Sequence, residues 1–483
     1  MRVGARYFHF ARNRAKQAPV TKLRITQPRK GHRMTQTPPP ADLTEALLDA
    51  ARRAGADAAD AIVIEGSSLS VDVRGGTLEQ AERAEGIDLG LRVLIGRRQA
   101  CVSSGDARPE TLRAMAERAV AMASEAPEDP YAGLAEPSQL ARQRSAEGLA
   151  LDDPAPEPEP AALEERALAA EAAAIANRHV SQIDSASASY GRRLVHLAAT
   201  NGFSGGYART MHSTSCIAIT GQGTAMERDW AAESRVHLAD LPEAEGIGAL
   251  AAERAAARAG ARKPPSGAWP VLYDERIASS LIGHLVAAIN GTAIARGASW
   301  LRDALGQQVL PEGLSLEENP HRPRIGGSRP FDAEGLATAP RVLVADGVLQ
   351  GWVLDLATAR KLGLESTANA SRGPGAPPSP STSNLALTQG AHSREDLIRD
   401  MGTGLLVTSL IGATINPTTG DYSRGASGFW VEGGQIAYPV NECTIAGNLR
   451  DMLMRLTPAN DARAHLGTVV PSLLVEGLTL AGA

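Results

Sequence analysis

The chain has 483 residues, of which 43% are apolar and 21% are charged, and its formal net charge is −5. These proportions are typical of a folded globular protein, the length allows two or three domains, and no apolar run reaches the roughly eighteen residues of a membrane helix. Residues 1–33 hold ten Arg or Lys and no Asp or Glu, which leaves −15 on residues 34–483. So acidic a body argues against nucleic-acid binding, because phosphate contacts need clustered Lys and Arg.

The basic leader lacks the apolar segment of a secretory signal and contains no serine, which argues against a transit peptide. We expect Met34 to be the native start and residues 1–41 to be a leader and disordered lead-in; a disordered arm that binds acidic partners is the alternative. The three cysteines, at positions 101, 216 and 443, are far apart and odd in number. They fit a reducing cytoplasm and form no thiolate metal motif.

Residues 42–125 predict the first part of an N-terminal helix/strand domain. Asp42 can cap a helix from Leu43 to Ala54, and Gly55 follows its end. The stretches DAIVIEG and SSLSVDVRGG predict two strands, and a hairpin turning at Gly96 follows. A helix with a proline in its first turn, Pro109, then ends this part.

The next stretch, residues 126–160, is rich in Pro, Glu and Asp without a steady period, which indicates an exposed loop. Residues 161–262 predict a central α/β region: helices near 161–177 and 243–261, with strands between them. Residues 263–483 show short apolar runs broken by Gly, Pro, Ser and Asn, which are typical of β structure. The expected class is therefore α+β, with an N-terminal helix/strand domain followed by a β-rich C-terminal domain.

The segment ERIASSLIGHLVAAINGTAIARGASWL, residues 275–301, begins with a predicted helix that is apolar on nearly all sides and ends at Asn290-Gly291. Its one histidine is His284. A peptidase zinc helix needs two histidines one turn apart and a carboxylate that deprotonates the metal-bound water. No two of the ten histidines lie within one turn, and residues 276–300 hold no Asp or Glu. A histidine held in or beside the core is therefore favoured over a metal ligand.

This helix and the C-terminal third resemble the TldD/TldE family, whose TldE branch is also called PmbA. The matching motifs are GHLVAAINGTAIARGASWL, TANASRGPGAPPSPSTSNLALTQG, LIRDMGTGLLVTSLIGATINPTTGDYSRGASGFWVEGGQIAYPVNECTIAGNLRDML and PSLLVEGLTLAG. They occur in the family's order, and the resemblance covers nearly all of residues 42–482. An older family label, modulator of DNA gyrase, finds no support in the acidic composition.

The resemblance implies a zinc peptidase with one catalytic subunit. In TldD the equivalent helix carries His-Glu-x-x-x-His, and a cysteine near the C-terminus completes the site. Here His284 matches the second histidine, Ser279 replaces the first and Ser280 replaces the glutamate; the segment TPANDARAHLGTVVPSLLVEG contains no cysteine. The chain thus looks like the TldE/PmbA branch: no catalytic residue set is intact, no metal or cofactor is expected in this chain, and zinc is expected in a TldD-like partner. Such a heterodimer degrades or processes unfolded or extended peptides in the cytoplasm.

Two C-terminal motifs supply candidate substrate-cleft residues. The Pro- and Gly-rich stretch ANASRGPGAPPSPSTSNLAL cannot be helical, so side chains must hold it, and we expect Asn369, Arg372, Ser383 and Asn384 to do so. For this stretch, a role as a rim of the shared cleft is slightly favoured over that of a solvated linker.

The stretch INPTTGDYSRGASGFWVEGGQ predicts two strands around a turn at residues 419–421. Across this turn Asp421 and Arg424 could pair, and Gly425 and Gly428 would allow close backbone approach. A purely structural turn is favoured over a nucleophile site. A peptide could be bound by adding a strand to a sheet edge.

Two other functions stay open at this stage. One is a stand-alone peptidase with a dispersed site built from residues such as His284, His392 and Cys443. The other is a non-proteolytic peptide-binding or regulatory protein. The sequence also allows a homodimer in the absence of the partner, and it predicts neither a nucleic-acid nor a membrane partner.

Overall fold

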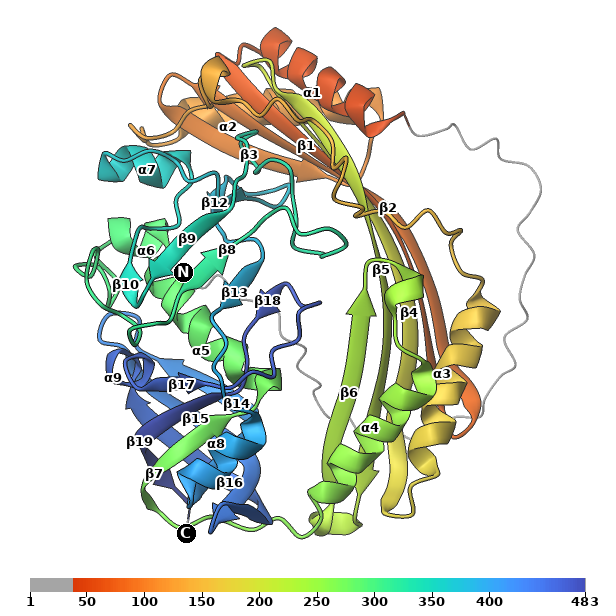
Figure 1. The fold of residues 1–483 in the computed structure, drawn as a ribbon. Helices are drawn as coiled ribbons and strands as arrows, with labels where there is room; N and C mark the ends of the chain where they lie inside the picture. The colour runs from red at the N-terminus through yellow and green to blue at the C-terminus, as the bar shows by residue number, and fades with distance from the viewer. Residues whose placement is uncertain (1–37, 483) are drawn as a thin grey trace. The chain divides into compact units, whose positions relative to one another are not determined.

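The computed structural model describes residues 38–482 (Figure 1). The basic leader and the expected start at Met34 lie outside the described residues. Mixed helices and strands confirm the α+β class. Within the described range no helix is both long and apolar enough to cross a bilayer.

The first half of the chain builds one antiparallel sheet of six strands in the order β3-β2-β1-β4-β5-β6. Strands from the predicted first part and from the predicted central region thus pair in a single sheet, because β1 lies between β2 and β4. The two strands predicted over residues 60–76 are one continuous strand. The bounds are β1 Ala58–Arg74, β2 Thr77–Ile95, β3 Arg98–Ser104, β4 Val180–Ala199, β5 Ser204–Thr220 and β6 Glu227–Arg235.

One face of this sheet is covered by four helices: α1 Pro40–Ala54, α2 Pro109–Glu125, α3 Pro160–Ile175 and α4 Ala244–Ala257 (Figure 1). The odd-numbered side chains of β1 point to them. Ala61 and Val63 share a core with α1 and α2, and Val71 and Val73 share one with α3 and α4. Since neighbouring side chains of a strand face opposite sides, the even-numbered residues of β1 line the other face. We call this the open face.

The helix boundaries depart from the sequence prediction at one point. Asp42 does not cap α1: the helix begins at Pro40, three residues before the predicted start at Leu43, and Asp42 lies in its first turn. A proline at the first helical position is already set to helical φ and needs no donor there, so it starts the helix without a side-chain cap. Gly55 ends α1 at φ +100°, and Pro109 begins α2, both as predicted.

The second half of the chain holds a six-stranded sheet in the order β16-β15-β14-β7-β19-β17 and a five-stranded sheet in the order β10-β9-β8-β13-β18. The longer strands are β7 Gly267–Tyr273, β14 Gly404–Ile415, β15 Asp421–Glu432, β16 Gln435–Asn448 and β19 Leu473–Ala481. The short ones are β8 Leu316–Glu318, β9 Arg341–Ala345, β10 Val348–Leu349, β11 Ala370–Ser371, β12 Ser379–Pro380, β13 Leu385–Leu387, β17 Leu456–Pro458 and β18 Thr468–Val469.

Five helices belong to this half: α5 Glu275–Ala288, α6 Gly291–Ala295, α7 Leu356–Leu362, α8 Arg394–Met401 and α9 Leu449–Leu453. Three short 3-10 helices lie earlier in the chain, at Pro137–Gln139, Gly223–Ala225 and Leu238–Asp240. Helix α5 lies in the largest core of the described chain, where Leu281 and Leu285 pack with Trp430 and Val271. The core therefore fixes the helix that carries His284.

Candidate functional site

Helix α5 begins at a buried acidic cap and is buried along most of its length. The Asp274 carboxylate accepts a hydrogen bond from the backbone N–H of Arg276 at 3.2 Å, which caps the helix. Ala278, Leu281 and Leu285 have no exposed surface, and this confirms the largely buried helix expected from the sequence.

His284 lies on α5 against the hairpin strand β15. Its ring packs edge-on to that of Tyr422 with centroids 5.9 Å apart, and the Tyr273 hydroxyl donates to the Tyr422 hydroxyl at 3.5 Å. The His284 Nε2 atom is buried and has no hydrogen-bond partner. Burial lowers the pKa of His284, and the positive charge of Arg424 lowers it further. The imidazole is therefore neutral at pH 7.

The two serines in the metal-motif positions add no metal ligands of the right kind. Ser280 donates its hydroxyl to the carbonyl of Ile277 at 2.7 Å, within the helix itself, and Ser279 is half-buried. Between residues 38 and 482 no three or more His, Cys, Asp or Glu side chains are placed to hold a metal ion. The donor set around His284 therefore does not fit zinc, which needs three or four His, Cys or carboxylate ligands.

The dispersed residues of the stand-alone alternative are not assembled either. Cys443 is buried, its thiol donates to the carbonyl of Ala426 at 3.2 Å, and burial raises its pKa to about 11. A thiol with that pKa is protonated at pH 7 and is a poor nucleophile. His392 is exposed in the segment before α8.

Strand β14 offers a free edge close to this helix. One edge pairs with β15 over most of the strand, but the other pairs with β7 only at residues 405–407. No described strand pairs with that second edge from residue 408 to 415. Ile411 in this stretch is 70% exposed, and the Thr408 hydroxyl is buried without a partner. An unpaired strand edge can accept an extended peptide through main-chain hydrogen bonds.

The Pro- and Gly-rich loop is held by the side chains expected to anchor it. Asn369 donates to both Glu318 carboxylate oxygens, at 2.9 and 3.0 Å, and Ser383 donates its hydroxyl to the same carboxylate at 2.9 Å. Glu318 is 3% exposed and ties the two ends of the loop together. The sequence prediction did not include Glu318, whose only local signal is that it takes the next alternate position after the apolar residues Leu314 and Leu316.

The other two anchors fasten the loop to distant parts of the chain. The Arg372 side chain is fully buried and forms an ion pair with Asp60 of β1. Asn384 donates to the carbonyl of Asn319 at 2.9 Å and to the hydroxyl of Ser328 at 2.7 Å. The loop thus lies against the open face of the first sheet at its Arg372 end.

The predicted pair across the β14–β15 turn is wrong. Asp421 accepts hydrogen bonds from the Thr419 hydroxyl at 2.6 Å and from the Asn448 amide at 3.2 Å, whereas Arg424 donates to the carbonyl of Gly412 at 2.7 Å. The turn's own polar groups are nearer to Asp421 than the arginine three residues on. The close approach expected at Gly428 is confirmed, since a Cβ there would lie 1.9 Å from the carbonyl oxygen of Leu406.

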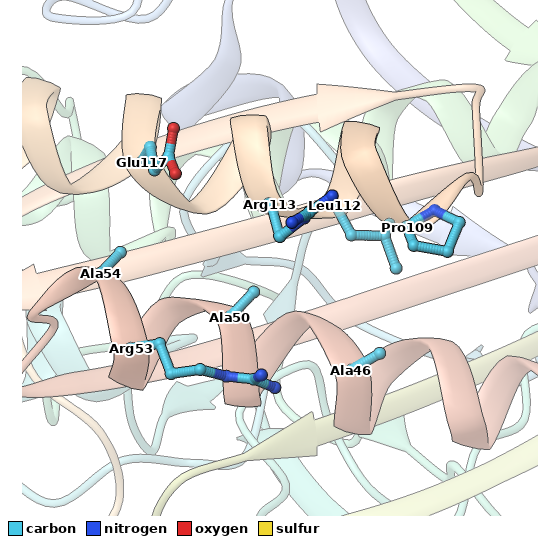
Figure 2. A pocket seen from close by; sticks show the side chains of 8 residues that line it. All are labelled: Ala46, Ala50, Arg53, Ala54, Pro109, Leu112, Arg113 and Glu117. Carbon is cyan, nitrogen blue, oxygen red and sulfur yellow. The ribbon is translucent and has the colours of Figure 1, made fainter.

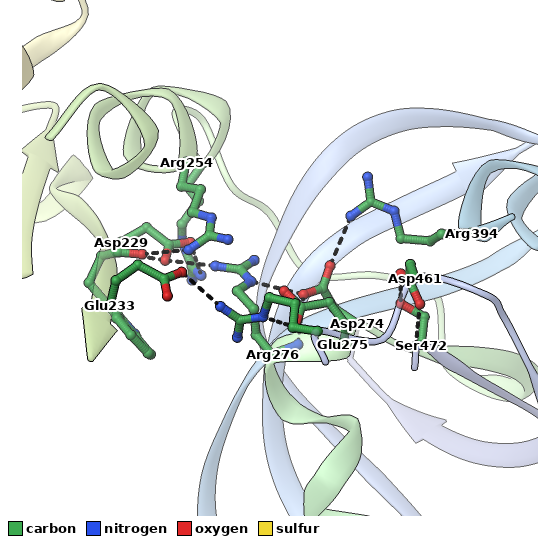
Figure 3. A network of polar contacts seen from close by, with 12 residues as sticks. Asp229, Glu233, Arg254, Asp274, Glu275, Arg276, Arg394, Asp461 and Ser472 are labelled. Carbon is green, nitrogen blue, oxygen red and sulfur yellow. Dashed lines mark hydrogen bonds and ion pairs between the residues drawn. The ribbon is translucent and has the colours of Figure 1, made fainter. Parts of the chain in front are cut away.

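A buried polar network joins β6 and α4 to the start of α5 (Figure 3). Arg276 pairs with Asp229 at 3.1 Å and with Asp274 at 2.9 Å, and Arg394 reaches Asp274 at 3.0 Å. Arg463 extends the network by pairing with Glu233 of β6 and Glu275 of α5. The sequence did not predict this network, because its members are up to 230 residues apart.

A separate groove lies between α1 and α2 (Figure 2). Its volume is about 280 Å³, and alanines of α1, such as Ala50, face Leu112 and Arg113 of α2. Its lining includes no histidine, cysteine or serine, so it does not supply the groups of a peptidase site.

Comparison with known proteins places this architecture in one family. The family models for PmbA/TldA metallopeptidase domain 1, central domain and C-terminal domain match residues 59–123, 153–259 and 266–482. The chain is 36% identical over 429 residues to the metalloprotease PmbA of Escherichia coli O157:H7, covering 88% of this chain and 92% of that protein.

Two solved structures have a similar fold. A Bacteroides thetaiotaomicron protein described as a proposed modulator of DNA gyrase superposes with a TM-score of 0.84 at 27% identity, over 92% of this chain and 98% of that one. TldE from Thermococcus kodakarensis shares the fold, with a TM-score of 0.79 at 20% identity over 91% of this chain and 100% of that one.

Proposed function

Since the chain belongs to the PmbA/TldA metallopeptidase family, we propose that it acts as the TldE-like subunit of a two-chain peptidase. In this proposal a TldD-like partner carries the zinc and the general base, and the present chain completes the substrate chamber in the cytoplasm. It binds unfolded or extended peptides and cuts none of them when it is alone.

The observation that carries this proposal is the state of α5. The helix retains one imidazole, His284, whose Nε2 has no partner, while Ser280 bonds to its own helix backbone. A lone neutral imidazole neither holds zinc tightly nor deprotonates a bound water. The helix keeps its core packing, which is what a scaffold beside a partner's active site requires.

The free edge of β14 supports the choice of substrate. On the edge that faces away from β15, no described strand pairs with the backbone of residues 408–415. Strand addition reads the peptide backbone and not its sequence, so it suits a peptidase for unfolded chains. Folded proteins offer fewer unpaired strands, since their sheet edges are commonly short, charged or covered, so we expect them to be poorer substrates.

The experiment compares the isolated chain, a TldD-like protein bearing His-Glu-x-x-x-His, and their equimolar mixture. Zinc is measured by elemental analysis and peptidase activity with unfolded β-casein. We expect zinc only in the TldD-like protein and full hydrolysis only in the mixture. One zinc per isolated chain together with chelator-sensitive hydrolysis would establish the stand-alone peptidase instead.

A matched pair of variants assigns the chemistry to one subunit. His284→Phe keeps a ring in the space beside Tyr422, so the mixture should retain its activity and zinc content. The equivalent substitution of the partner's second motif histidine should abolish both. If His284→Phe alone removes zinc from the mixture, the proposed division of roles is wrong.

A further inference from the structure

The open face of the first sheet carries a cleft that the peptidase chemistry does not use. A cavity of about 190 Å³ lies between this face and residues 329–333 and 370–372. A second hollow of about 540 Å³ continues along the sheet, and the two share Ile64, Arg193 and Arg209 in their lining.

Strand register explains why two arginines meet here. Gly66 of β1 lies opposite Arg193 of β4, and Arg193 lies opposite Arg209 of β5. Gly86 of β2 completes the row beside Gly66. Residues directly opposite in an antiparallel pair have Cβ atoms about 5 Å apart, and like charges in that position are destabilising. Across these four strands, two arginines therefore lie opposite each other, next to two glycines.

Three guanidinium groups of this cleft, those of Arg193, Arg209 and Arg329, lack acidic partners in the described chain, whereas Arg372 pairs with Asp60 and Arg192 with Asp152. Arg209 donates to the carbonyl of Ser328 at 2.7 Å, and Arg329 donates to the carbonyls of Ala370 and Ser381. Neither forms an ion pair with a described carboxylate, and the Nε atoms of both are buried without a partner. The exposed side chain of Arg193 makes no hydrogen bond or ion pair within residues 38–482. Burial lowers the pKa of Arg209, and repulsion from Arg329 and Arg193 lowers it further.

The carboxylates that face the cleft do not neutralise these charges. Asp332 accepts backbone N–H groups from Glu334, Leu336 and Ala370. Glu85, in the lining of the larger hollow, pairs with Arg83 at 2.6 Å, and Asp60, behind Arg372, is shared by Arg372 and Arg92. Asp88 lies on β2, two strands away from Arg193, a separation of about 10 Å at the usual strand spacing. The lining thus retains an excess of positive charge.

The other end of the smaller cavity is apolar. Ile62, Val195 and Leu197 form its floor, and Phe331 and Tyr207 pack edge-on at 5.6 Å at its side. A ligand that suits both ends has an anionic group for the arginines and an apolar group for this floor. The C-terminal residue of a peptide with an apolar side chain has both, and a guanidinium binds a carboxylate through two parallel hydrogen bonds.

We propose that this cleft binds the C-terminal carboxylate of an extended peptide whose last side chain is apolar, with Arg193 and Arg209 as the carboxylate ligands. The main chain of the peptide then runs along the glycine row into the larger hollow. This inference rests on the proposed function for the peptide nature of the ligand, and its test needs neither zinc nor hydrolysis.

The experiment measures binding to the isolated full chain by fluorescence anisotropy. The probes are fluorescein-labelled Gly-Ala-Ala-Leu with a free C-terminal carboxylate and the same peptide as its C-terminal amide. We expect the amide to bind about 10- to 100-fold more weakly, since it loses a charge-assisted contact. Arg193→Gln and Arg209→Gln should weaken binding of the acid by a similar factor and leave the amide unchanged. Equal affinities for acid and amide would overturn the proposal.

Two controls test whether binding is specific to these arginines and to a peptide. Arg228→Gln, at an exposed arginine of β6 that lines neither hollow, should leave both affinities unchanged. Inorganic phosphate should compete only weakly; if it binds as tightly as the acid peptide and loses affinity in Arg193→Gln, the cleft is a general anion site and the peptide assignment is wrong. Because these measurements use one chain, they stand or fall independently of activity in the two-chain mixture.

Discussion

The two charge-rich regions of this chain differ in whether their charged side chains have partners of opposite charge. In the network at the start of α5, burial opposes ionisation of Asp274, but Arg276 and Arg394 outweigh it and lower its pKa. In the cleft on the open face, burial raises the pKa of Asp332, and burial and neighbouring arginines lower that of Arg209. The first region pairs its charges and stabilises the fold. The second leaves arginines without acidic partners, which is expected where a ligand supplies the missing charge.

The largest effect should come from breaking the paired region. Asp229 is 6% exposed and pairs with both Arg258 and Arg276. Asp229→Ala removes the carboxylate that two buried guanidinium groups share and leaves each with one acidic partner, Glu227 or Asp274. We expect a loss of about 3–5 kcal/mol in the free energy of unfolding. Urea unfolding measures it. Asp303→Ala, at an exposed pair with Arg302, should cost at most about 1 kcal/mol. Similar losses for the two variants would contradict the assignment of the network as structural.

The next largest loss of stability should separate Gly428, which is packed against a neighbouring strand, from Gly86, which lines the cleft. A Cβ at Gly428 would lie 1.9 Å from the carbonyl oxygen of Leu406, whereas one at Gly86 would meet no atom within 4 Å. Gly428→Ala should therefore lose about 1–3 kcal/mol through overpacking. Gly86→Ala should change stability little. Thermal unfolding of both variants is the measurement, and a larger loss for Gly86→Ala would show that the floor is not open.

The pH dependence of stability tests the second region, where burial raises the pKa of the carboxyl groups of Asp332 and Glu334. Burial raises the pKa of Glu334 to about 8, and the nearby carboxyl group of Asp332 contributes to this rise. Below the unfolded pKa of about 4.5 both states keep the proton; as the pH rises toward 8 only the unfolded chain releases it, so stability falls over this window.

Glu334→Gln removes this titration. The variant should gain about 3 kcal/mol relative to the parent between pH 5 and pH 8, because the unfolded chain alone releases the proton over most of this window and each pKa unit corresponds to about 1.4 kcal/mol. Thermal midpoints at the two pH values measure the gain. Asp274→Asn should show the opposite sign, and in an acid window: the pKa of Asp274 is lowered, so the parent's advantage over the variant is fully present above about pH 4 and disappears as the pH falls below 3.8. Thermal midpoints measured from about pH 5 downward test this.

The substitution with the smallest expected effect on stability, Arg193→Gln, tests the cleft most directly. Arg193→Gln removes one of two like charges that face each other, so stability should stay within about 0.5 kcal/mol of the parent or rise. The same variant should lose affinity for the acid peptide. A stability loss as large as that of Asp229→Ala would make Arg193 a structural residue.

Local patterns in the sequence predicted the elements well and their partners poorly. The apolar run of residues 275–289 predicted a buried helix, because a helix with apolar residues on nearly all sides must lie in a core. The density of proline predicted a loop held by side chains, and Asn369, Arg372, Ser383 and Asn384 do hold it. Glu318, which accepts from both Asn369 and Ser383, could not be named, since nothing local relates residues 318 and 369.

The predicted pair of Asp421 and Arg424 failed for a related reason. Opposite charges at short spacing suggest a contact, but Thr419 and Asn448 supply closer donors to the Asp421 carboxylate. Polar side chains in a turn often bond to groups within the turn itself. Charge pattern alone therefore did not decide which partner this residue has.

What the sequence by itself determined is the set of elements, the family motifs and the absence of a two-histidine zinc helix, because these depend on periodicity and on which residue types are present. Only the tertiary structure decided that Arg193 and Arg209 meet across β4 and β5, and that Asp229 lies beside Arg276. Such meetings depend on strand register and on packing between distant segments. Backbone pairing and core burial set both, and neither is encoded within a few neighbouring residues.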